Sequence, residues 1–93
     1  MTTGASGSSY QLILDRKAER DLSALPDQDY ERLDAHIVAL GDNPRPHGTV
    51  KLEDDLYRLR VGPWRIVYII DDAARLVIVS RVVRRQKDTY RRL

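Results

Sequence analysis

The spacing of apolar residues changes along this chain of 93 residues, from a strand pattern to a helical pattern and back. The first ordered run, YQLILD (residues 10–15), is short and rich in strand-forming residues, so it predicts a first β-strand. Apolar residues then recur three and four positions apart, and from residue 56 onward apolar and polar residues alternate. The pattern therefore predicts a strand, then helices, then a sheet.

Two helices are predicted between residues 16 and 41. Asp15 can cap the first, RKAERDLSAL, and Pro26 separates it from the second, DQDYERLDAHIVALG. Asp27 is the expected N-cap of the second helix, and Gly41 suits its C-terminal end. The apolar stripes are Ala18, Leu22 and Leu25 in the first helix and Tyr30, Leu33, Ile37 and Leu40 in the second. Two adjacent helices of this kind predict an antiparallel helical hairpin.

Three further strands are predicted after a loop, GDNPRPHGT, at residues 41–49. They are LYRLRV (56–61), WRIVYII (64–70) and RLVIVSRVV (75–83), separated by Gly-Pro and by DDAA. Strands joined by such short turns form an antiparallel meander. The expected fold class is therefore α+β, with an N-terminal strand, a helical hairpin and then an antiparallel β-meander.

A two-residue loop at residues 62 and 63 fixes the register of the first hairpin. Arg60 then faces Arg65, and Arg58 faces Val67. One face of the hairpin is apolar and can pack on the helices: it comprises Tyr57, Leu59, Val61, Trp64, Ile66, Tyr68 and Ile70. The other face carries Arg58, Arg60 and Arg65.

Like charges opposite each other in a sheet destabilise it, by up to about 1 kcal/mol. A sequence that keeps such a pairing indicates a function, and arginine forks match phosphate oxygens in pairs. The arginines therefore predict a phosphate-binding face. The alternative is that the acids at residues 53–55 neutralise the cluster.

Charge is divided unevenly along the chain, although the net charge is only +2. Residues 1–57 hold six basic and eleven acidic side chains, and residues 58–93 hold ten basic and three acidic ones. This asymmetry favours an anionic partner for the second half, either nucleic acid or an acidic protein. A solvated charged surface is the alternative.

The basic C-terminal stretch, residues 80–92, contains a single tyrosine, Tyr90. A tyrosine among cations can stack on a base. The cations also favour its deprotonated form, which can take a proton from a hydroxyl. Simple packing of the ring is the alternative.

Several classes of protein are not expected. The chain has no cysteine, and its histidines, His36 and His47, are too far apart for a metal motif, so neither disulfides nor a metal site is expected. No apolar run is long enough for a transmembrane helix.

Residues 1–9 read as a flexible tail, and residues 10–93 as a single domain. The expected location is cytoplasmic.

From Tyr10 onward the chain resembles the RelE/ParE toxin superfamily. The matching pieces are DRKAERDLSALP, NPRPHGTVKL, LYRLRVGPWRIVYII and an arginine followed six residues later by a tyrosine. The resemblance implies the RelE-like microbial RNase fold. It also implies a toxin of a type II toxin–antitoxin pair, with a cognate antitoxin as partner.

The RelE branch is the one that the chain resembles most. This resemblance implies an endonuclease that cuts mRNA in the ribosomal A site without a metal or other cofactor, through attack by the RNA 2′-OH. It assigns catalysis to Arg65, Arg84 and Tyr90, with Tyr90 as general base. The basic residues expected to bind RNA phosphates are Lys51, Arg58, Arg60, Arg81 and Arg85.

Three points stay open at this stage. Arg85 can replace Arg84 in its role, because the sequence does not fix the register of the last strand. ParE-type relatives share the fold and poison DNA gyrase, which is a non-nuclease alternative. A toxin that has lost activity and only binds its antitoxin is a further alternative.

Overall fold

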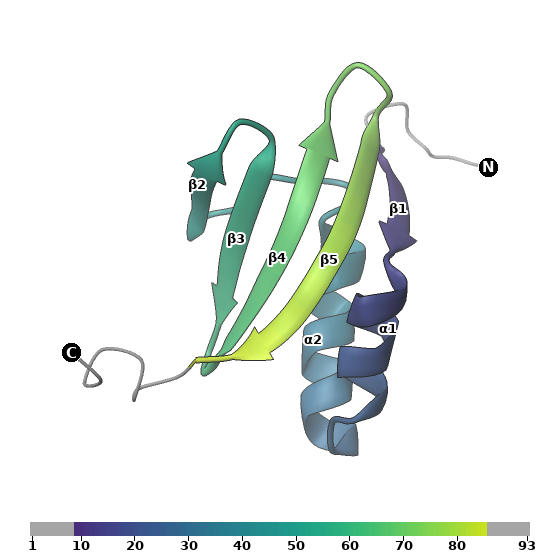
Figure 1. Ribbon diagram of the computed structural model, residues 1–93, viewed down its shortest axis with the longest axis vertical. Helices are drawn as coiled ribbons and strands as arrows, with labels where there is room; N and C mark the ends of the chain where they lie inside the picture. The colour runs from purple at the N-terminus through teal and green to yellow at the C-terminus, as the bar shows by residue number, and fades with distance from the viewer. Residues whose placement is uncertain (1–8, 86–93) are drawn as a thin grey trace.

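The computed structural model describes residues 9–85 as one five-stranded sheet with two helices on one of its faces (Figure 1). In chain order the elements are β1 (Gln11–Leu14), α1 (Arg16–Ser23), α2 (Asp27–Ala39), β2 (Thr49–Glu53), β3 (Leu56–Val61), β4 (Trp64–Asp71) and β5 (Leu76–Arg84). This arrangement confirms the predicted α+β class and its order of elements. No helix in the described part of the chain is long and apolar enough to cross a membrane.

The sheet has the strand order β1-β5-β4-β3-β2. Strands β2 to β5 form the antiparallel meander, and β1 pairs in parallel with β5 at the far edge. The register of the β3–β4 hairpin is the predicted one, with Arg60 opposite Arg65 and Arg58 opposite Val67. Its turn needs a positive φ at Gly62, where φ is +58°.

One strand and one cap differ from the sequence predictions. The sequence assigned no strand to TVKLE, yet these residues form β2. Four of its five residues are exposed, so β2 lacks the buried alternation that marks a strand, and pairing with β3 holds it in the sheet. The N-cap of α2 is Pro26, in an extended conformation, and the predicted cap Asp27 is the first helical residue.

The core lies between the helices and the face of the sheet that the sequence predicted to be apolar. All seven predicted residues of that face in β3 and β4 are buried. The helices contribute their predicted stripes, except that Leu25 is only partly buried and Tyr30 is 43% exposed. Among residues 9–85 the helices cover this face only, and the opposite face of the sheet is here called the outer face.

Candidate nucleic-acid interface

The three arginines of the β3–β4 hairpin lie on the outer face. Cross-strand partners share a face of a sheet, and Arg65 pairs with Arg60 on one side and with Val83 of β5 on the other. Arg58 lies in the next row, beside Val67. The strand register thus places three arginines on one face of the sheet, as the sequence predicted.

Two members of the cluster, Arg58 and Arg60, keep their positive charge. Within residues 9–85, no ion pair joins Arg58 or Arg60 to an acid, so the alternative of neutralisation by residues 53–55 finds no support. Arg60 is exposed, whereas Arg58 and Arg65 are half-buried. Half-buried guanidinium groups attract an anion more strongly than fully solvated ones, because less water screens them.

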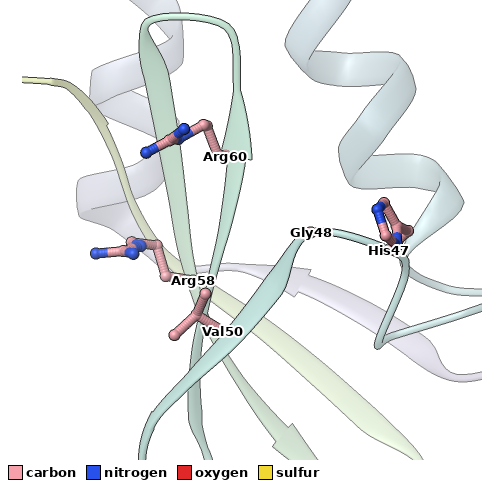
Figure 2. Close-up of a pocket in the computed structure, with 5 residues that line it drawn as sticks. All are labelled: His47, Gly48, Val50, Arg58 and Arg60. Carbon is pink, nitrogen blue, oxygen red and sulfur yellow. The ribbon is translucent and has the colours of Figure 1, made fainter.

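A pocket of about 500 Å³ opens beside two of these arginines (Figure 2). Arg58 and Arg60 extend from β3 to the same side, and Val50 comes from the adjacent strand β2. His47 and Gly48, at the end of the loop that leads into β2, complete the lining. An arginine pair beside a pocket of this size can hold a phosphate and part of the group attached to it.

A family model described as "ParE toxin of type II toxin-antitoxin system, parDE" matches residues 12–89. The chain belongs to this toxin family. The match covers most of the chain, and it confirms the membership of the RelE/ParE superfamily that the sequence motifs predicted.

Known RelE proteins resemble this toxin in sequence and in fold. A curated protein of Methanocaldococcus jannaschii, named "Putative toxin RelE1", is 26% identical over 82 residues, which span 83% of this chain and 91% of the relative. The RelBE2 toxin–antitoxin complex of Mycobacterium tuberculosis contains a chain with 26% identity and a TM-score of 0.73, over 83% of this chain and 99% of that one.

Two further structures share the fold at lower identity. RelE from the RelE–RelB complex of Pyrococcus horikoshii has a TM-score of 0.79 at 24% identity, over 85% of this chain and 98% of that one. The isolated E. coli RelE toxin has a TM-score of 0.75 at 23% identity, over 90% and 94% of the two chains. These likenesses confirm the RelE-like fold.

In this toxin Arg81 is engaged in an ion pair within the protein. Its Nε and Nη2 donate to the two carboxylate oxygens of Asp21 in α1, at 2.8 and 3.2 Å. Asp21 also accepts a hydrogen bond from the backbone N–H of Val82 at 2.9 Å. Hydrogen bonding to Arg81 lowers the pKa of Asp21, and the same bond raises the pKa of Arg81. This arginine therefore holds α1 against β5, a role that the sequence did not reveal.

Arg84 and Arg85 lie on opposite faces of the sheet. Arg84 pairs with the core residue Trp64 and places its guanidinium 5.6 Å from the centre of the indole ring, on the helix side. The backbone N–H of Arg85 donates to the carbonyl of Pro63 at 2.7 Å, which extends the pairing by one residue. Alternation along the strand then assigns the Arg85 side chain to the outer face, with Arg65.

The remaining predicted residues lie apart from the hairpin arginines or beyond the described chain. Lys51 pairs with the core residue Tyr57, so its exposed side chain belongs to the helix side of the edge strand. Tyr90 lies outside the described residues. No group of three metal-ligating side chains comes together within residues 9–85.

A polar network missed at the sequence level fixes the loop before β2. Arg45 forms an ion pair with Asp72 at 2.8 Å and donates to the hydroxyl of Tyr57 at 3.2 Å. The Tyr10 hydroxyl donates to the same Asp72 carboxylate at 2.6 Å. The hydrogen bonds from Arg45 and Tyr10 lower the pKa of Asp72 to about 2. The signal was the arginine of the NPRP stretch, which lies between two prolines in a loop.

The buried hydroxyl of Tyr68 holds the other end of this loop. It donates to the carbonyl of Pro44 at 2.8 Å and lies 3.2 Å from Oγ1 of Thr49. Burial raises the pKa of Tyr68, which keeps the hydroxyl protonated and able to donate. His47 and Gly48 therefore lie on a loop that is fixed on both sides.

Proposed function

We propose that this toxin is a metal-independent endonuclease that cleaves mRNA in the A site of translating ribosomes. The observation that carries the proposal is the row of Arg60 and Arg65 on the outer face, with Arg58 beside it and no acid paired to Arg58 or Arg60 among residues 9–85. Opposed cations cost stability in the free protein, and a bound phosphate removes that cost.

Cleavage requires the protein to hold the phosphate, to stabilise the charge that develops on it and to take the proton of the 2′-OH. The 2′-oxygen of the RNA loses its proton and attacks the adjacent phosphorus, the bond between phosphorus and the 5′-oxygen breaks, and the 5′-oxygen takes a proton from water. The products are a cyclic phosphate and a 5′-hydroxyl. Arg58 and Arg60 hold the phosphate, and Arg65 stabilises the charge that develops on it in the transition state. Tyr90 takes the proton from the 2′-OH, as the family resemblance implies.

A further cation is needed near the leaving oxygen. The six-residue spacing to Tyr90 favours Arg84, whereas Arg85 shares the outer face with Arg65 and is not stacked on Trp64. The geometry therefore favours Arg85 for this role, with Arg84 supporting the fold at Trp64.

An antitoxin is the second expected partner, and the outer face offers it an apolar row. Ile13, Ile78, Ile69 and Leu56 are cross-strand partners that follow one another across four strands. Of the related structures, those from M. tuberculosis and P. horikoshii are complexes of a toxin with its antitoxin. We infer that an amphipathic, acidic antitoxin segment lies on this row and reaches the arginines.

Inhibition of DNA gyrase is the second candidate function, because the matching family model is named after ParE. A toxin of that kind needs no phosphate-cleaving residues. The outer-face arginines would then only bind a partner, and their removal would leave RNA metabolism unaffected.

A cell-free translation reaction with the purified toxin and a labelled mRNA separates these functions. Cleavage that depends on translating ribosomes is the expected result, and Arg65→Ala should abolish most of it. Cleavage of naked RNA would remove the ribosome from the mechanism. Intact RNA together with gyrase-dependent breaks in a supercoiled plasmid would instead establish the second function.

A further inference from the structure

His47 shares a pocket with two of the outer-face arginines, although no role was expected for it from the sequence. Strand β2 pairs with β3 as far as Thr49, which faces Leu59, and the chain then leaves the sheet at Gly48. Gly48 has a φ of +97°, a backbone conformation that residues other than glycine rarely adopt. This turn leaves Arg60 without a β2 partner and opens the pocket between β3 and the loop.

The lining has the chemistry of a nucleotide site. It offers two guanidinium groups, an imidazole, the apolar side chain of Val50 and the bare backbone of Gly48, with no carboxylate among them. Guanidinium groups donate to phosphate oxygens, and an imidazole ring stacks on a nucleobase or donates to its edge. A volume of about 500 Å³ lies within the range of pockets that bind small molecules.

We propose that this pocket holds the nucleotide next to the scissile phosphate, with His47 contacting its base and Arg58 and Arg60 its phosphate. The inference rests on the proposed RNA cleavage and adds a residue that selects the sequence at the cut. Arg65, which lies opposite Arg60 on β4, acts on the same phosphate as it is cleaved.

The loop is built to keep His47 in place. On the N-terminal side of His47, the loop is held by the Arg45–Asp72 ion pair and by the hydrogen bond from Tyr68 to Pro44. On its C-terminal side, it is held by the contact between Thr49 and Tyr68. An exposed imidazole on a fixed loop loses little conformational entropy when a base stacks on it, which favours binding.

The chain supplies a matched control in its other histidine. His36 is also exposed, but it lies on α2, and its Nδ1 is 2.9 Å from the carbonyl oxygen of Arg32. The pocket lining does not include it. Substitutions of His36 therefore remove the same ring from the helix layer and leave the pocket intact.

Binding can be tested without any catalytic turnover by following the imidazole resonances of the full-length toxin by NMR. Each resonance is assigned from His36→Gln or His47→Gln. The probe is an RNA trinucleotide with a 2′-deoxy centre, which cannot be cleaved, and inorganic phosphate is its comparison. The expected result is a shift of the His47 resonance by the trinucleotide that exceeds the shift by phosphate, with His36 unchanged. Equal responses to both probes, or no response of His47, would overturn the proposal.

Cleavage in the cell-free translation reaction provides the second readout. Loss of a stacked base predicts about a tenfold lower kcat/KM for His47→Ala, mainly through KM, and a changed distribution of cut sites. His47→Tyr should restore part of the efficiency because it keeps an aromatic ring, and His36→Ala should match the wild type. A His47→Ala toxin that cuts the same sites with wild-type efficiency would disprove the role of His47. A wild-type toxin that cuts no RNA, yet shows the His47 shift, would refute the proposed function and leave the nucleotide pocket standing.

Discussion

Arg60 and Arg65 face each other across β3 and β4, which is an unfavourable arrangement for two cations. A sheet position of this kind favours a β-branched, uncharged residue, so the arginine at position 60 lowers stability in the free protein. The effect of this pairing on stability can be measured and compared with its effect on activity.

Arg60→Thr should therefore separate stability from activity. We expect the free energy of unfolding to stay equal or to rise by up to about 1 kcal/mol, because the repulsion with Arg65 is removed. Ribosome-dependent cleavage should fall at least tenfold, since a phosphate-binding group is lost. Urea denaturation and the cell-free assay measure the two effects, with Arg20→Ala on α1 as the charge-matched control. A variant that loses stability as well as activity would show that Arg60 is structural.

Arg84 ends β5 and Arg85 continues its pairing by one residue, so alternation assigns their side chains to opposite faces of the sheet, which makes them a second test at single residues. Arg85→Ala is expected to lower the rate of cleavage with little change in stability. Arg84→Ala should instead lower the free energy of unfolding by about 0.5–1 kcal/mol, because the cation–π contact with Trp64 is lost. Single-turnover cleavage and urea denaturation of both variants measure the difference, and the reverse ranking would assign the catalytic role to Arg84.

At the scale of elements, a side chain of α1 makes the contacts with the edge of β5 that a neighbouring strand would otherwise make. Strand β1 pairs with β5 only as far as Val79, so the following residues of β5 have a free edge. The carboxylate of Asp21 satisfies the Val82 N–H on this edge and binds Arg81 at the same time.

Asp21→Ala should therefore destabilise the toxin. Loss of the acceptor leaves the half-buried Val82 N–H without its hydrogen bond, which predicts a loss of about 1–3 kcal/mol in the free energy of unfolding. Chemical denaturation measures it, and Asp34→Ala on the exposed side of α2 is the control for removing a helix carboxylate. Equal stability of Asp21→Ala and the wild type would mean that water satisfies this edge.

The elements also show what the sequence can and cannot specify. Apolar periodicity was enough for both helices, and a two-residue turn was enough for the β3–β4 register. The sequence did not reveal which face of the sheet each β5 side chain occupies. A register shift opposite Val67 and Tyr68 inserts Ser80 into β5 and reverses the alternation of the side chains that follow. Simple alternation from Val79 would have put Arg84 on the outer face and Arg81 on the helix side. Long-range pairs such as Arg81 with Asp21 were equally hidden, since they join residues 60 positions apart.

The loop before β2 gives a pH-dependent prediction at the same scale. Asp72 has a pKa of about 2 in the folded toxin, below the value of about 3.9 expected for an unfolded chain. Its contribution to stability is therefore complete above pH 4 and is lost as the pH falls toward 2. Asp72→Asn should reduce the slope of Tm against pH in that window. A variant with the wild-type slope would show that other carboxylates control the acid unfolding.

At the scale of the whole molecule, Arg58, Arg60 and Arg65 lie on the face that the helices leave open. The chain has a net charge of only +2, so attraction of RNA depends on where the charges lie rather than on their sum. Arg58 and Arg60 keep their charge on this face, whereas Arg81 shares its charge with Asp21. These two kinds of arginine should contribute differently to RNA binding.

The dependence of RNA affinity on salt distinguishes them. Each cation that neutralises a phosphate on single-stranded RNA adds about 0.7 to the slope of log K against log salt concentration, because a counterion is released. Arg58→Ala and Arg60→Ala should each lower the slope by about that amount, measured by fluorescence anisotropy with an uncleavable oligonucleotide. Arg81→Ala should leave the slope nearly unchanged, since Asp21 already neutralises this arginine, and should instead lower the thermal stability. A fall in slope for Arg81→Ala equal to that for Arg58→Ala would mean that RNA displaces Asp21. The RNA-binding face would then extend around the free edge of β5 rather than stay on the hairpin.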